Sequence, residues 1–198
     1  MNREALSHFK KADPIIYKAA LKTNIEERPK PQKEDYFVEL VDTIVSQQLS
    51  GKAAATIFGR LKKLMPQEKI TAENLLGVTD EEIRSAGISY SKINYIKGIA
   101  TEVTNGNLDL GKFDEQSDET VKEELVKLKG IGPWSAEMFL MFSLGRPDIF
   151  SSGDLGLKNA IKKLYGFKKD PTIPQMEKIS SKWSPYRTYA CRVLWKSL

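Results

Sequence analysis

Residues 125–166 read LVKLKGIGPWSAEMFLMFSLGRPDIFSSGDLGLKNAIKKLYG, and this stretch decides the fold. One helical pattern ends near Leu128, Gly130 and Gly132 permit a tight backbone turn, and Pro133 suits the first position of a helix. A further helical pattern follows Asp154. The stretch therefore predicts helix, tight hairpin, helix, short loop and helix.

The hairpin at residues 130–132 exposes bare peptide where the next helix places the positive end of its dipole. Such amides suit an anion of the size of a phosphate. Asp154 follows Ser151-Ser152-Gly153 and precedes an apolar helical pattern, so we expect it at the start of that helix.

Three segments together carry a resemblance to a known family. They are LKGIGPWSA (residues 128–136), SSGDLGL (151–157) and WSPYRTYACRVLW (183–195). Together they resemble the helix-hairpin-helix DNA glycosylases, with the 3-methyladenine DNA glycosylase II branch as the best match. The likeness covers most of the chain from Ala12 onward.

The resemblance implies an all-α fold of two helical lobes within one unit of residues 1–198. Residues 35–127 then form mainly one lobe, and residues 1–34 with 128–198 form the other, which carries the hairpin and the catalytic aspartate. Larger relatives have an additional β-rich N-terminal domain, and we expect this chain to lack it.

The residues themselves also favour an all-α fold. A helical pattern over residues 3–22 breaks at Asp13-Pro14, where Asp13 is suited to cap the second helix. Residues 24–33 read as a loop, residues 35–48 as an amphipathic helix, and Ser50-Gly51 as a break before the next helix. No convincing alternating strand pattern interrupts this series.

Composition limits the classes of protein to consider. The formal charge of the 198 residues is +5 and the pI is about 9.1, which suits a polyanionic partner without identifying DNA. The single cysteine excludes an internal disulfide and a four-cysteine iron–sulfur cluster within the chain. The sequence contains no apolar run of membrane-spanning length and no secretory signal, so we expect no membrane partner and a place in the bacterial or archaeal cytoplasm or, in a eukaryote, the nucleus. We also expect a monomer.

Asp154 is the predicted catalytic residue. Cleavage of an N-glycosidic bond develops positive charge on the sugar, which a fixed carboxylate stabilises while it orients water. The resemblance implies this role for Asp154, and the competing interpretation is that it only caps a helix. No second carboxylate is evident to protonate the leaving base, which favours alkylated purines because they are already cationic or activated.

The resemblance places Trp134 and Trp195 in a pocket that stacks against the flipped-out base. The alternative is that both are core aromatic residues. Bifunctional relatives have a lysine where this chain has Trp134, so the resemblance implies a hydrolase without lyase activity.

The resemblance also assigns the contacts with DNA. Gln48, with Leu49 beside it, matches the wedge that fills the gap left by the base, although a polar residue at a helix end is an equal alternative. The predicted phosphate contacts are Lys129, Gly130, Gly132 and Ser135. No cofactor is required, and a structural monovalent cation is expected on the main-chain carbonyls of Val126, Leu128 and Ile131.

The sequence thus predicts a monofunctional glycosylase that removes 3-methyladenine and 7-methylguanine from double-stranded DNA by base flipping and so initiates base excision repair. Two alternatives stay open. One is a catalytically silent helix-hairpin-helix DNA-binding module, and the other is a glycosylase for deaminated or oxidised bases.

Overall fold

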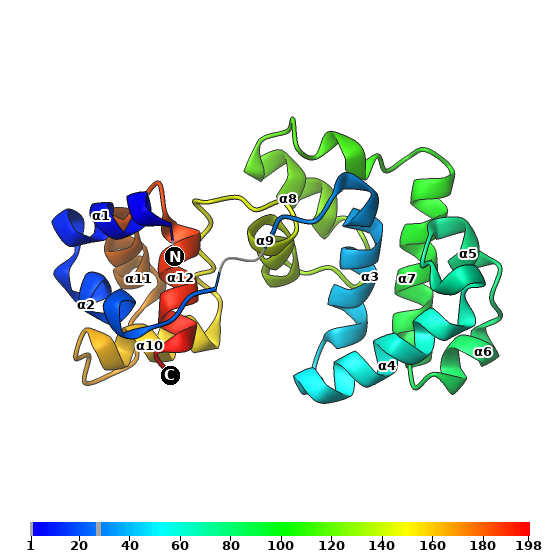
Figure 1. The fold of residues 1–198 in the computed structure, drawn as a ribbon, viewed down its shortest axis with the longest axis horizontal. Coiled ribbons are helices and arrows are strands. Elements are labelled where there is room, and N and C mark those ends of the chain that lie inside the picture. The colour runs from blue at the N-terminus through cyan, green and yellow to red at the C-terminus, as the bar shows by residue number, and fades with distance from the viewer. Residues whose placement is uncertain (1, 27–28) are drawn as a thin grey trace. The chain divides into compact units, whose positions relative to one another are not determined.

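The computed structural model describes residues 2–26 and 29–198, and within these residues all regular secondary structure is helical. The chain divides into two compact units (Figure 1). Unit 1 comprises residues 1–30 and 140–198, and unit 2 comprises residues 31–139. None of the helices in the described ranges is long and apolar enough to cross a membrane.

Unit 1 joins the two ends of the chain. Its elements are α1 (Arg3–Ala12), α2 (Pro14–Lys22), α10 (Leu155–Leu164), α11 (Ile173–Ser180), the 3₁₀ helix η4 (Ser181–Trp183) and α12 (Arg187–Lys196). Helix α12 packs against both α2 and α10, and α1 packs against α2 and η4. The C-terminal helix is thus central to this unit, as Figure 1 shows in red.

A buried carboxylate fastens the N-terminal helices to the C-terminal part of unit 1. Asp13 Oδ1 accepts the Ile15 amide at 3.0 Å and so caps α2, as the sequence predicts. Its Oδ2 accepts the Tyr165 hydroxyl at 2.6 Å and Trp183 Nε1 at 3.1 Å. Burial and the neighbouring Asp13 raise the pKa of Tyr165, which therefore stays a neutral donor.

Unit 2 is built on α3 and α7, which pack against each other. Its elements are η1 (Lys33–Asp35), α3 (Tyr36–Ser46), α4 (Gly51–Leu64), η2 (Pro66–Glu68), α5 (Ala72–Leu76), α6 (Asp80–Ser85), α7 (Tyr90–Thr104), η3 (Leu110–Lys112), α8 (Asp118–Val126) and most of α9 (Pro133–Phe142). The apolar side chains of α3 predicted to face the core are all buried. Thr79 and Glu82 form a capping box at the start of α6.

The division between the units differs from the one implied by the resemblance. It falls between Phe139 and Leu140, inside α9, and so the hairpin belongs to unit 2 and not to the unit that carries Asp154. The reason is packing, because the Phe139 ring meets Tyr36 and Phe113 edge to face at 5.9 and 6.2 Å. The first part of α9 is therefore anchored in the core of unit 2.

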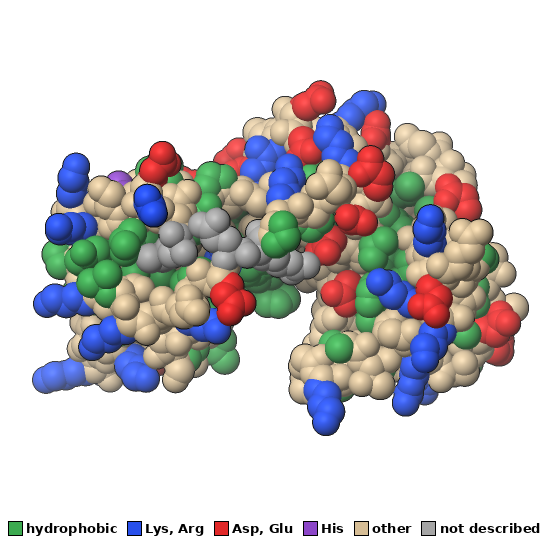
Figure 2. Space-filling model, in the orientation of Figure 1, with side chains coloured by type: hydrophobic (Ala, Val, Ile, Leu, Met, Phe, Trp, Pro, Cys, Tyr) green, Lys and Arg blue, Asp and Glu red, His purple; other side chains and the backbone are tan. Residues whose placement is uncertain are grey.

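The charge is divided unequally between the units. Unit 1 contains 18 Lys and Arg against 8 Asp and Glu, whereas unit 2 contains 13 against 18. The basic excess of the chain thus comes entirely from unit 1. On the face drawn in Figure 2, lysines and arginines are dispersed among other side chains and do not merge into one patch.

Candidate active site

Asp154 is held at the start of α10 in unit 1. Its Oδ1 accepts the Leu157 amide at 2.7 Å, which makes it the N-cap of the helix, and also accepts Trp195 Nε1 at 2.9 Å. Asp154 and Trp195 are both half-buried. Two donors on one oxygen fix the orientation of the carboxylate. The capping role is therefore real, and it is compatible with catalysis because it presents the charged group in a fixed geometry.

Trp195 is placed by its neighbours as well as by Asp154. Its ring lies 6.0 Å from the Phe142 ring, centroid to centroid, with 35° between the planes. A Cβ added to Gly156 would lie 3.1 Å from both Asp154 Oδ1 and Trp195 Cδ1. Neither Phe142 nor Gly156 could be assigned to the site from the sequence, because these contacts are not local enough to leave a pattern. Trp195 was expected only to stack on a base, and the structure adds a hydrogen bond to the aspartate.

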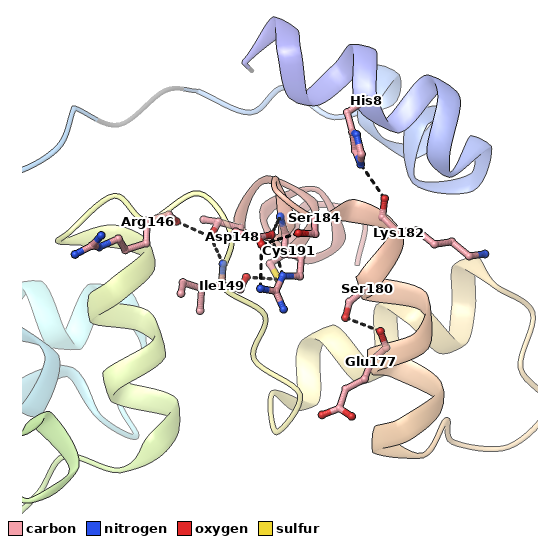
Figure 3. A network of polar contacts seen from close by, with 11 residues as sticks. His8, Arg146, Asp148, Ile149, Glu177, Ser180, Lys182, Ser184 and Cys191 are labelled. Atoms are coloured by element: carbon pink, nitrogen blue, oxygen red, sulfur yellow. Dashed lines mark hydrogen bonds and ion pairs between the residues drawn. The ribbon is translucent and has the colours of Figure 1, made fainter. Parts of the chain in front are cut away.

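The segment before the Asp154 loop is tied to the start of α12. Asp148 accepts Arg187 Nε at 2.8 Å on Oδ1, and Arg187 Nη2 at 3.0 Å and Ser184 Oγ at 2.8 Å on Oδ2. Figure 3 shows Asp148 and Ser184 within this polar network, close to Cys191. Partial burial acts to raise the pKa of Asp148, but the donors of Arg187 and Ser184 outweigh it and lower that pKa.

Thr188 adds further hydrogen bonds to the same segment. Its hydroxyl donates to the Arg146 carbonyl at 2.7 Å and accepts the Ile149 amide at 3.0 Å. Buried Cys191 also lies against the Ile149 carbonyl, with Sγ 3.7 Å from the oxygen. Residues 146–149 are thus fixed on α12, the helix that supplies Trp195.

The hairpin in unit 2 uses its two glycines differently. Gly130 has φ +92°, and a Cβ there would lie 2.4 Å from the Tyr95 ring, so no other residue fits. A Cβ on Gly132 would meet nothing within 4 Å, and this residue is exposed. The residue thus stands in open space just before α9, where a helix start suits a phosphate.

The other residues predicted at the hairpin differ in their exposure to solvent. Lys129 is exposed, and Trp134 keeps 45% of its surface accessible. Ser135 is buried, with its Oγ 3.4 Å from Gln47 Nε2, so this hydroxyl helps to hold the hairpin. The Leu128 carbonyl accepts the Ile131 amide at 3.1 Å, which closes the turn.

The predicted wedge lies on the turn between α3 and α4. Helix α3 ends at Ser46, two residues earlier than the sequence suggests, because Gln48 adopts a left-handed φ of +58°. Gln48 and Leu49 are both exposed. Gln47, to which the sequence assigns no role, donates from Nε2 to the Gly130 carbonyl at 2.9 Å. The structure thus brings the turn and the hairpin together within unit 2.

The chain is similar to proteins that repair DNA bases. Residues 41–185 match the family described as HhH-GPD superfamily base excision DNA repair protein. DNA-3-methyladenine glycosylase 1 of Schizosaccharomyces pombe is 36% identical over 84% of this chain and 74% of its own length. DNA-3-methyladenine glycosylase of Saccharomyces cerevisiae is 35% identical over 97% of this chain and 78% of its own.

Two solved structures share the fold closely. The DNA-3-methyladenine glycosidase of Bacillus halodurans has a TM-score of 0.86 at 38% identity, over 98% of this chain and 88% of that one. The S. pombe 3-methyladenine DNA glycosylase in complex with abasic DNA has a TM-score of 0.86 at 33% identity, over 98% and 95%. The all-α fold and the family expected from the motifs are thereby confirmed, and the chain belongs to the HhH-GPD superfamily of base excision DNA repair proteins.

Proposed function

We propose that this protein is a DNA glycosylase that hydrolyses the N-glycosidic bond of alkylated purines, such as 3-methyladenine and 7-methylguanine, in duplex DNA. The observation that carries the proposal is the fixed Asp154 carboxylate, held by the Leu157 amide and Trp195 Nε1. Relatives of this chain are named as 3-methyladenine glycosylases, and one is seen with abasic DNA, the product of such a reaction.

Asp154 acts on the sugar. As the bond to the base lengthens, positive charge develops on the deoxyribose ring, and a carboxylate already fixed in place stabilises it without reorganisation. The same carboxylate orients the water that attacks the anomeric carbon. Its hydrogen bonds to Leu157 and Trp195 keep Oδ1 in place throughout the reaction.

The leaving base needs little help. An N3- or N7-alkylated purine carries a positive charge, so it departs as a neutral base without a general acid. Electron-rich rings hold such a cation through stacking and cation–π attraction, worth about 1–3 kcal/mol per base. Trp134 and Trp195 are the rings that we assign to this task, and the 45% exposure of Trp134 leaves it accessible to a ligand.

The reaction stops at the abasic site. A lyase step requires an amine that attacks the sugar to form a Schiff base. The position that provides this amine in bifunctional relatives holds Trp134 here. We therefore expect no strand cleavage and no covalent complex on treatment with borohydride, both of which a denaturing gel detects.

We assign the contacts with DNA to the hairpin and the α3–α4 turn. The exposed residues Gly132 and Lys129 suit a backbone phosphate. Gln48 and Leu49 are exposed and so available to fill the space that the flipped base leaves. Ser135 contributes through the position of the hairpin, since its hydroxyl is buried.

We assign a structural monovalent cation to the carbonyls of Val126, Leu128 and Ile131. Carbonyl oxygens are the hard donors that such an ion prefers, and the Leu128 oxygen keeps a second lone pair beyond its bond to the Ile131 amide. The ion would supply positive charge beside a bound phosphate, and no chemical step depends on it. No cofactor is assigned to the reaction.

The experiment that tests this function is base release from a panel of duplexes that each carry one lesion. Release of 3-methyladenine and 7-methylguanine, with intact strands until the abasic sites are cleaved by alkali, supports the proposal. Release confined to deaminated or oxidised bases assigns the protein to another substrate class. Binding to all duplexes with no release identifies a DNA-binding module instead.

A further inference from the structure

The α3–α4 turn has a backbone conformation that needs external support. Gln48 adopts φ +58°, a region that residues with a side chain rarely occupy, and the turn keeps Gln48 and Leu49 exposed. At the end of α3, the Ile44 and Ser46 carbonyls accept amides of the turn at 3.3 and 3.2 Å. Other carbonyls of this end are bonded from outside the turn.

Lys92 provides this support from α7. Its Nζ donates to the Val45 carbonyl at 2.9 Å and to the Gln47 carbonyl at 2.8 Å. A cation at the C-terminal end of a helix is also favoured by the helix dipole. Partial burial lowers the pKa of Lys92, as expected for an ammonium group taken out of bulk water.

Gln47 connects the same turn to the hairpin. While Lys92 holds its carbonyl, its side-chain Nε2 donates to the Gly130 carbonyl at 2.9 Å and lies 3.4 Å from Ser135 Oγ. The chain of contacts thus runs from α7 through Gln47 to the turn of the hairpin. All of it lies within unit 2.

We propose that Lys92 is a positioning residue for base flipping, which holds Gln48 and Leu49 at a fixed spacing from the hairpin through Gln47. The turn and the hairpin then keep a fixed geometry relative to each other while the wedge is inserted and the phosphate is bound. This inference rests on the proposed function. It requires no contact between Lys92 and DNA.

The variants separate positioning from general stability. Lys92→Met keeps most of the aliphatic chain and removes the ammonium group. Lys97→Met is the matched control, because Lys97 lies on the same helix and pairs with Asp80 at 2.5 Å, away from the turn. Lys92→Cys treated with 2-bromoethylamine restores an amine of similar reach, and the other cysteine, Cys191, is buried.

The first readout is fluorescence of 2-aminopurine placed beside a stable abasic analogue in duplex DNA, at saturating protein. Wild type and Lys97→Met should unstack the probe and raise its fluorescence, and Lys92→Met should lose most of the rise while its affinity for the duplex falls less than about threefold. Aminoethylated Lys92→Cys should recover it. An equal rise with Lys92→Met, no rise with wild type, or an equal loss with Lys97→Met would overturn the inference.

The second readout is single-turnover base release from duplex and from single-stranded DNA with the same lesion. Lys92→Met should slow release from the duplex by about tenfold and leave the single-stranded rate within about twofold, since only the duplex needs a wedge. Equal slowing on both substrates would contradict a role in flipping. Because the fluorescence assay needs no chemistry, a wild type that unstacks the probe but releases no base refutes the proposed function and not this inference.

Discussion

Trp195 Nε1 donates a hydrogen bond of 2.9 Å to Asp154 Oδ1, and this joins the last helix of the chain to the start of α10. The same oxygen caps α10 through the Leu157 amide. A charge-assisted bond of this kind is worth about 1.5–3 kcal/mol, so the indole contributes to the carboxylate's orientation as well as to any pocket. The arrangement makes Trp195 a residue with two separable roles.

Trp195→Phe tests the hydrogen bond while it keeps a stacking ring. We expect single-turnover base release to slow by about tenfold, because Asp154 loses an orienting donor. Binding of the DNA should change little. Trp183→Phe is the matched control, since Trp183 Nε1 also donates to a carboxylate, that of Asp13, in the same unit. It should lower the melting temperature and leave the rate unchanged. Equal rates for Trp195→Phe and wild type would show that the bond is dispensable.

Gly156→Ala tests the close packing beneath the pair. Alanine favours a helix over glycine by up to about 1 kcal/mol. The new methyl, however, would lie 3.1 Å from Asp154 Oδ1 and Trp195 Cδ1, so it should displace one of them, offset this gain in stability and slow base release. Gly98→Ala, in α7 with nothing within 4 Å of its added Cβ, should raise stability without affecting the rate. A Gly156→Ala enzyme with wild-type kinetics would contradict this reading of the contact.

Asp148 gives the fold a dependence on acid pH. Its pKa is lower in the folded protein than in the unfolded chain, so its stabilising contribution is present above the unfolded value and is lost as pH falls through the folded value. Because the Asp148–Arg187 pair is partly exposed, we expect it to contribute about 2 kcal/mol to the free energy of unfolding. Asp148→Asn should therefore be less stable at pH 7 and should lose less stability than wild type between about pH 5 and pH 2, as followed by urea unfolding. Equal losses of stability in wild type and Asp148→Asn over this pH range would contradict the role assigned to Asp148.

The local features of the fold could be predicted from the sequence. Asp13 and Asp154 cap helices as expected, because capping depends on residues within one turn. The amphipathic face of α3 is likewise buried. Such patterns extend over a few residues, and the family motifs extend over short segments. Local patterns therefore predicted the helical fold class and the place of Asp154 at the start of α10.

The contacts that organise the site could not be predicted in the same way. Trp195 lies 41 residues from Asp154 in sequence, and Lys92 lies 45 residues from Gln47. Helix packing decides which acceptor a given lysine or tryptophan reaches. The periodicity of the sequence does not contain this information. In the sequence, Gly156 looks like any other residue of a helix, and only the structure shows the Trp195 indole close to it. The unit boundary inside α9 could not be predicted for the same reason, because the aromatic contacts of Phe139 decide it.

The most direct test of the central claim is single-turnover release of 3-methyladenine from duplex DNA by wild type and by Asp154→Asn, at equal occupancy of the DNA. The amide keeps an oxygen for the Leu157 amide and Trp195 Nε1 but lacks the negative charge. We predict release by wild type, a loss of at least about a hundredfold in the variant, and duplex affinity within about threefold. Release at the wild-type rate by Asp154→Asn would contradict the assignment of Asp154 as the catalytic carboxylate.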